Sequence, residues 1–85
     1  MLYVLICKDK IDSEELRKEV RPHHLHYLED FDIKLAGPIL SHDQTTMIGS
    51  MILLDCENWE AAEAFASQDP YNNAGLFESV EISPF

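Results

Sequence analysis

The stretch from Arg21 to Tyr27 (Arg-Pro-His-His-Leu-His-Tyr) contains three of the four histidines of the chain. Pro22 lacks a backbone N–H and disfavours a helical residue before it, so it is predicted to open a helix at the first position. Counted from there, the spacing i, i+3, i+4 and i+7 of one helical stripe is met by His24, Tyr27, Leu28 and Phe31. His24 therefore occupies a core position, where an imidazole can accept a proton if another group orients it.

A second ionisable residue, Asp69, falls on the buried side of another predicted helix, from Trp59 to Gln68. The apolar stripe of that helix comprises Trp59, Ala62, Phe65 and Ala66. Because an unpaired buried carboxylate is costly, we expect Asp69 to accept a hydrogen bond from one ring nitrogen of His24. The other nitrogen is then left as a general base. The chain has no G-x-S-x-G motif, so this pair suits proton abstraction, elimination or isomerisation better than acyl transfer.

Each of these residues also has a simpler structural interpretation. Asp69 precedes Pro70 and can serve as a helix cap, a role compatible with the pair because a carboxylate has two oxygens. A single histidine on an apolar stripe is more often a satisfied core residue than a base. Arg21 is a candidate to hold an anionic substrate group, although in so acidic a chain it more often pairs with a surface carboxylate.

Metal binding has weaker support. His23 and His26 are spaced i, i+3 and can chelate a metal on one helix face, but no cysteine or carboxylate offers a recognised spacing to complete the site. We therefore expect no metal and no other cofactor. His42 lies in a predicted turn, where we expect it to be inert.

The first half of the predicted scaffold is a strand followed by a broken helix. The apolar run Leu2–Cys7 predicts the strand. Asp12 and Glu15 resemble a capping box at the start of a helix that runs to about Val20. A second helical piece, over 22–31, is expected to continue it after a kink at the proline.

The rest of the chain predicts three more strands, over 32–40, 45–54 and 77–83, and the Trp59–Gln68 helix capped by Asn58. Asp69-Pro70 opens a further turn that Gly75 stops, and Pro38 assigns the 32–40 strand to an edge or bends it. This order is the ferredoxin-like βαββαβ split of the α+β class. It predicts a four-stranded antiparallel sheet with both helices on one face.

The other face of that sheet has no segment left to cover it. Residues 2–7 and 51–54 are apolar on both sides, whereas a sheet with one solvated face should alternate apolar and polar residues. We therefore expect a homodimer formed sheet against sheet through the open face. The alternative is a monomer whose apolar sheet face binds a ligand.

Composition limits the class of protein. The 85 residues make a single domain, 1–85, and a hydrophobic content of 46% is typical of a globular chain. A net charge of −10 argues against nucleic acid and anionic membranes as partners. The two cysteines, Cys7 and Cys56, belong to no C-x-x-C and are expected to be buried free thiols. No leader-like or membrane-spanning apolar segment is evident, so we expect a cytoplasmic protein.

Several pieces of the chain, in order, resemble the YciI-like (YCII-related) family. They are Met1-Leu2-Tyr3-Val4, Arg21-Pro22-His23-His24-Leu25, Leu35-Ala36-Gly37-Pro38, Gly49-Ser50, Glu60-Ala61-Ala62, Asp69-Pro70-Tyr71 with Ala74-Gly75-Leu76, and Ser83-Pro84-Phe85. The resemblance implies a ferredoxin-like fold of the dimeric α/β-barrel type. It also implies a His–Asp active-site pair, whose positions are His24 and Asp69. The segment between Gly37-Pro38 and Gly49 is shorter than is usual in the family, which points to a different substrate if that hairpin lines the pocket.

We therefore expect a small cofactor-free enzyme that transfers a proton on a small organic substrate, with His24 as the base and Asp69 as its orienting partner. The expected substrate contacts are Arg21, Tyr27, Gly37, Pro38 and Ser50. The alternative is a non-catalytic ligand-binding or accessory module in which the His–Asp pair is structural.

Overall fold

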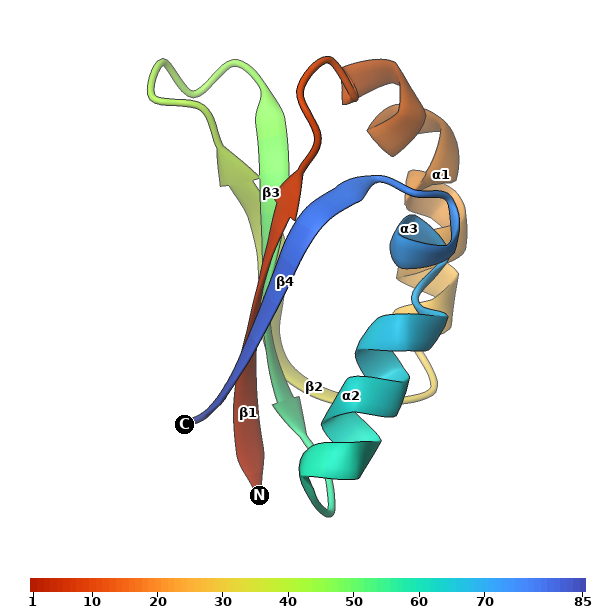
Figure 1. Cartoon of the computed structure of the whole chain (residues 1–85), viewed down its shortest axis with the longest axis vertical. Helices are drawn as coiled ribbons and strands as arrows, with labels where there is room; N and C mark the ends of the chain where they lie inside the picture. The colour runs from red at the N-terminus through yellow and green to blue at the C-terminus, as the bar shows by residue number, and fades with distance from the viewer.

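Four antiparallel strands form one sheet, and the helices all lie against the same face of it (Figure 1). The computed structural model describes every residue from 1 to 85. In chain order the elements are β1 (Leu2–Asp9), α1 (Glu14–Leu28), β2 (Asp32–Leu40), β3 (Met47–Asp55), α2 (Trp59–Gln68), α3 (Pro70–Asn73) and β4 (Phe77–Pro84). The strand order is β2-β3-β1-β4, which confirms the ferredoxin-like fold and puts Pro38 on an edge strand, as predicted.

The core fills the space between the sheet and the helices, because alternate residues of the two central strands point toward the helices. The central pair is in register, with Leu5 opposite Ile52 and Tyr3 opposite Leu54. The buried cluster consists of Tyr3, Leu5, Cys7, Ile52, Leu54, Ala62 and Phe65. Burying a large apolar side chain stabilises a fold by about 1.5–3 kcal/mol. This single layer is therefore what holds the helices on the sheet.

The prediction of two helical pieces before residue 31 is wrong, because α1 is one helix from Glu14 to Leu28 that contains Pro22. Pro22 is exposed, so the carbonyl that loses its helical partner there can bond to water instead. The capping box is also wrong. Asp12 has a left-handed φ of 59°, which Asp tolerates, and the residue at the N-cap is Ser13, without a side-chain capping bond.

The continuous helix matters because it carries two buried polar residues, Arg17 and His24, on one face. Arg17 reaches β1, where Nε donates to Asp9 Oδ2 at 2.6 Å and Nη2 donates to Asp9 Oδ1 at 2.9 Å. The side chains of both residues are at most 5% exposed. This bidentate ion pair joins α1 to the end of β1. Burial alone would lower the pKa of Arg17, but its bonds and charge interaction with Asp9 outweigh burial and raise it.

The second helical segment agrees with the sequence. α2 has the predicted bounds, and the Asn58 side chain accepts a hydrogen bond from the Ala61 N–H at 2.9 Å. α3 begins at Pro70 with Asp69 as its cap. Gly75, with a φ of 77°, follows α3 and turns the chain into β4. No helix in the structure is long and apolar enough to span a membrane.

The two thiols are both free but differ in exposure. Cys7 is buried in the core cluster, as expected. Cys56 is only half-buried, because it follows the end of β3 and therefore lies outside the central layer. Burial, with a smaller contribution from the negative charge of Asp69, raises the pKa of Cys7 to about 12.

The buried thiol leads to a prediction about alkaline stability. The unfolded chain ionises Cys7 near its ordinary pKa of 9.0, whereas the folded chain holds the proton to about pH 12. The folded state therefore binds more protons over this range, and the free energy of unfolding should fall as the pH rises from 9 to 12. Urea unfolding across this pH range should show a shallower fall in Cys7→Ala. Cys56→Ala should keep the wild-type slope, and equal slopes in all three proteins would contradict the assignment.

The Arg17–Asp9 pair gives a prediction about folding stability. Asp9→Asn leaves the guanidinium buried beside a neutral amide, so the free energy of unfolding should fall by about 3–5 kcal/mol. Thermal and urea denaturation measure this loss. Asp30→Asn makes the same charge change at an exposed site and should alter stability by less than about 0.5 kcal/mol. Equal effects of the two substitutions would show that the pair does not join α1 to β1.

Candidate active site

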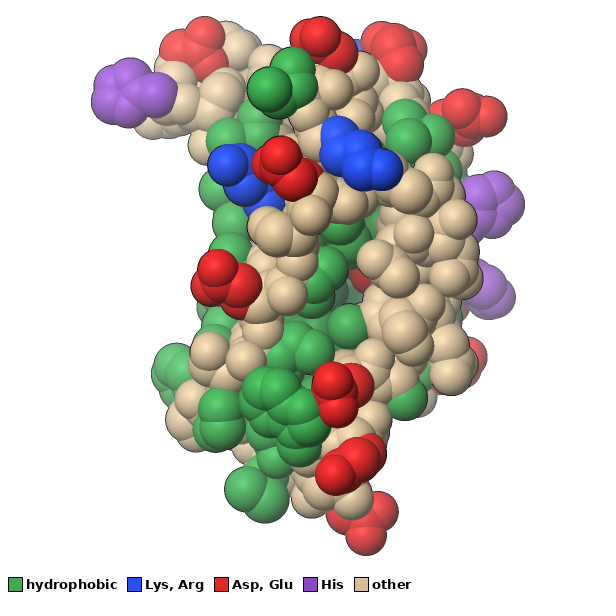
Figure 2. Space-filling view, viewed as in Figure 1, with side chains coloured by type: hydrophobic (Ala, Val, Ile, Leu, Met, Phe, Trp, Pro, Cys, Tyr) green, Lys and Arg blue, Asp and Glu red, His purple; other side chains and the backbone are tan.

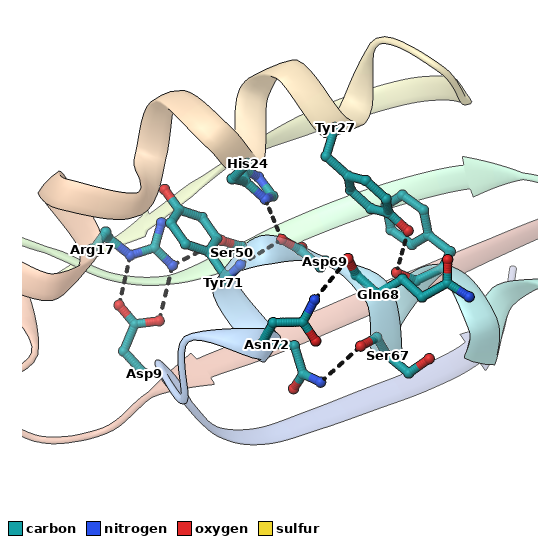
Figure 3. A network of polar contacts seen from close by, with 12 residues as sticks. Asp9, Arg17, His24, Tyr27, Ser50, Ser67, Gln68, Asp69, Tyr71 and Asn72 are labelled. Carbon is teal, nitrogen blue, oxygen red and sulfur yellow. Dashed lines mark hydrogen bonds and ion pairs between the residues drawn. The ribbon is translucent and has the colours of Figure 1, made fainter.

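His24 and Asp69, which are 45 residues apart in the chain, lie in hydrogen-bond contact between α1 and the start of α3 (Figure 3). The distance from His24 Nδ1 to Asp69 Oδ1 is 2.8 Å. The residues are 6% and 2% exposed, respectively, so this contact is shielded from water on most sides. The contact expected from the helical stripes is therefore present in the fold.

Tyr71 fixes both members of this pair. Its backbone N–H donates to Asp69 Oδ1 at 2.9 Å, so the same carboxylate oxygen accepts from the histidine ring and from the first turn of α3. Its ring stacks on the His24 imidazole, with centroids 4.0 Å apart and planes inclined by 19°. The imidazole is thus held at one edge by a hydrogen bond and over one face by an aromatic ring.

The second ring nitrogen of His24, Nε2, has a different environment from Nδ1. No hydrogen bond within the chain involves Nε2, and no fully buried side-chain nitrogen or oxygen lacks a partner. Nε2 is therefore not fully buried, and His24 lines a cavity. With Nδ1–H donating to the carboxylate, Nε2 carries the free lone pair, which is the arrangement of a general base.

A second polar group lies beside this pair. Ser50, on the helix-facing side of β3, accepts a hydrogen bond from Arg17 Nη2 at 2.9 Å. The Arg17 guanidinium also lies over the Tyr71 ring, with its Cζ 4.5 Å from the centroid. Tyr71 is therefore enclosed between Arg17 and His24, as Figure 3 shows. Burial raises the pKa of the Tyr71 hydroxyl even though the charges of Arg17 and Arg21 lower it, so the hydroxyl stays protonated at neutral pH.

The cavity next to His24 has a volume of about 120 Å³ and lies between α1, the two strands β2 and β3, and Tyr71. It is lined by Arg17, Arg21, His24, Leu25, Leu28, Ala36, Gly37, Pro38, Ser50, Ile52 and Tyr71. A larger hollow of about 380 Å³ lies at the turn after β1, but it contains neither a histidine nor a residue of the His24 pair. Of these two hollows, the smaller one contains the histidine, with both polar and apolar residues in its wall.

Four of the five expected substrate contacts, Arg21, Gly37, Pro38 and Ser50, line this cavity. Tyr27 does not. Its hydroxyl donates to the Phe65 backbone oxygen at 2.9 Å, and its ring packs against Phe65 and Phe31. Burial and the negative charge of Asp69 raise the pKa of Tyr27 to about 12. Tyr27 is one helical turn beyond His24, where α1 faces α2, so it belongs to the core.

The sequence reasoning missed Asp9, Arg17 and Tyr71. Each had a signal. Asp9 continues the alternation of Tyr3, Leu5 and Cys7, which places it on the helix-facing side of β1. Arg17 precedes His24 by seven residues and so shares its helix face once the helix is read as continuous. Tyr71 follows the Asp-Pro cap, where the cap bond fixes its backbone.

The exposed histidines are separate from this site. His26 lies beside Glu29, with Nδ1 2.9 Å from the carboxylate. Across the whole chain, no group of three or more His, Cys, Asp or Glu side chains is arranged to hold a metal ion.

Comparison with known proteins places this chain in a family. A family model described as the YCII-related domain matches residues 1–85. Protein YciI of Escherichia coli O6:H1 (strain CFT073) is 39% identical over 94 residues, a match that covers 100% of this chain and 96% of that protein. An uncharacterized protein of Haemophilus influenzae Rd is 33% identical with the same coverage.

Solved structures share the fold. The 5-chloro-2-hydroxyhydroquinone dehydrochlorinase TftG from Burkholderia phenoliruptrix AC1100, solved in complex with 2,5-dihydroxybenzoquinone, is 31% identical. It superposes with a TM-score of 0.92, and the match covers 100% of this chain and 93% of TftG. A putative antibiotic biosynthesis monooxygenase from Nitrosomonas europaea, 14% identical with a TM-score of 0.57, shares the fold alone. The chain therefore belongs to the YCII-related domain family.

Proposed function

We propose that this chain is a small enzyme that removes a proton from a small organic substrate, in an elimination or an isomerisation that needs no cofactor. His24 is the general base and Asp69 is its orienting partner. The observation that carries the proposal is the hydrogen bond of Asp69 to Nδ1, which leaves Nε2 free beside the cavity. A histidine with a purely structural role would have both ring nitrogens satisfied by the protein.

The chemistry follows from this arrangement. Nε2 accepts the substrate proton. In an elimination, the electron pair left behind forms the new double bond and expels the leaving group. In an isomerisation, the double bond shifts and the imidazole returns the proton to another carbon. The ring becomes a cation as it takes the proton, and the adjacent carboxylate stabilises that charge. Because Tyr71 holds Asp69 and covers the ring, little reorganisation is needed at the moment of transfer.

The similarity to TftG supports the same reaction class. A dehydrochlorinase releases hydrogen chloride, which is an elimination. The cavity measures about 120 Å³, which is below the roughly 150 Å³ of a cavity that encloses benzene, so its size favours a small substrate. Arg21, Gly37, Pro38 and Ser50 are the proposed substrate contacts. A cytoplasmic location stays a prediction.

We also propose that two copies associate through the open face of the sheet. On that face β1 and β3 present Val4, Ile6, Met51 and Leu53, and the edge strand β2 adds Leu35. Ile6 and Leu35 are 39% and 57% exposed, which is costly for apolar side chains on a central and an edge strand. Figure 2 shows hydrophobic side chains along the left flank, the side of the sheet that faces away from the helices.

The pair can be tested with Asp69→Asn, because Asn caps a helix as well as Asp and preserves the bond to the Tyr71 N–H. Asn cannot provide the negative charge, so the single His24 tautomer should be lost and kcat should fall by about 10²–10⁴-fold. Ring ¹⁵N chemical shifts report the tautomer. Chloride release from 5-chloro-2-hydroxyhydroquinone, the compound named for TftG, provides the first activity assay.

His24→Gln should abolish turnover, whereas His26→Gln, at an exposed site, should leave both readouts unchanged. If Asp69→Asn keeps the wild-type tautomer and the wild-type rate, then Asp69 acts only as a helix cap. The proposal would then be wrong in its central feature.

The open face predicts the oligomeric state. Light scattering coupled to size exclusion should give twice the chain mass of 9.8 kDa. Ile6→Glu puts a charge at the centre of the face and should shift the protein to the monomer without loss of secondary structure. His23→Glu adds the same charge on the exposed side of α1 and should leave the dimer intact. A monomeric wild type at millimolar concentration would refute the dimer.

A further inference from the structure

The hydroxyl of Ser50 is oriented by the buried ion pair behind it. Ser50 is 3% exposed and lines the same cavity as His24. Its Oγ accepts a hydrogen bond from Arg17 Nη2, and Arg17 is itself fixed by two hydrogen bonds to Asp9. Ser50 is therefore held from one side by a group that cannot rotate away.

The hydrogen bond from Arg17 determines whether the Ser50 hydroxyl acts as a donor or an acceptor toward the cavity. A guanidinium has donors and no acceptor, so the Ser50 hydroxyl cannot return its own proton to Arg17. No other hydrogen bond within the chain involves this hydroxyl. Its proton is therefore free for an acceptor in the cavity, and the bond from a charged donor makes the hydroxyl a stronger donor in turn.

The charges around the cavity favour an acceptor with negative charge. The charge of Asp9 is paired with Arg17, and neither Asp9 nor Asp69 lines the cavity. Arg21 contributes a positive charge to the cavity wall. The Tyr71 hydroxyl is kept protonated by burial and adds no competing anion.

We propose that Ser50 donates a hydrogen bond to an oxygen of the substrate that is, or becomes, anionic when His24 takes the proton. The substrates of this site are then small compounds with an enolic or phenolic oxygen, most simply a single hydroxylated ring. Nε2 removes the proton either from this hydroxyl itself or, in the keto form, from the carbon next to the carbonyl. The electron pair of the broken bond then places negative charge on that oxygen, and Ser50 stabilises the charge there. This inference rests on the proposed role of His24 and adds the group that faces the developing charge.

The test uses two ligands of the same ring skeleton. The hydroxyl groups of 2,5-dihydroxy-1,4-benzoquinone are vinylogous acids that ionise readily, and TftG is known in complex with this compound. The dimethoxy analogue cannot ionise. Titration calorimetry should show that Ser50→Ala weakens binding of the dihydroxy ligand by about 10-fold or more, because a charge-assisted bond is lost. Binding of the dimethoxy ligand should change by less than about 3-fold.

Ser67→Ala removes a hydroxyl from the exposed face of α2, where it bonds to the Ala64 carbonyl, and should change neither affinity. Thermal unfolding confirms that each variant is folded. Undiminished affinity of folded Ser50→Ala for the dihydroxy ligand overturns the role of Ser50. Failure of the wild type to bind that ligand at millimolar concentration overturns the substrate class.

These outcomes are separate from the test of the base. Binding is measured without turnover, so Ser50→Ala can lose affinity even if the His24 tautomer does not depend on Asp69. In that case, Ser50 binds an anion in a site that is not catalytic. If the His24 tautomer depends on Asp69 but Ser50→Ala binds the dihydroxy ligand as tightly as the wild type, then His24 remains the proposed base and the Ser50 contact is rejected.

Discussion

Two buried carboxylates, Asp9 and Asp69, set the constraint on which the arrangement of this protein depends. A buried carboxylate is tolerated only with a partner close at hand. One helix supplies both partners, because Arg17 and His24 lie two turns apart on the same face of α1. The position of α1 over the sheet is therefore determined by polar contacts at one end and in its middle, in addition to the apolar layer shared with α2.

Tyr71 makes these two pairs a single unit. Its ring lies between the guanidinium of Arg17 and the imidazole of His24, and its backbone is bound by Asp69. The ring is 1% exposed, so it is also a core residue. The proposed site is thus part of the interior of a very small domain, and the side chains that would do the chemistry also support the fold.

Several features could be predicted from the sequence, because each depends on local periodicity or on the cost of a buried charge. They are the order of strands and helices, the bounds of α2, the Asp69 cap and the contact between His24 and Asp69. The continuity of α1 could not be predicted. Pro22 favours a break locally, whereas the contacts of Arg17 with Asp9 and of His24 with Asp69 anchor α1 on either side of it. With a break at Pro22, Arg17 and His24 would not be expected to share one helix face. The hydrogen bond from Arg17 to Ser50 was therefore not predicted either.

The double use of Asp69 Oδ1 has a consequence for how the site opens. The same oxygen holds the base and the first turn of a helix only four residues long. Short helices fray readily, since few hydrogen bonds resist opening. Unwinding of α3 would withdraw the backbone amide that helps to hold the carboxylate and would free the ring stacked on His24. Amide hydrogen exchange at Tyr71 would therefore measure how often the contacts that align the base are broken.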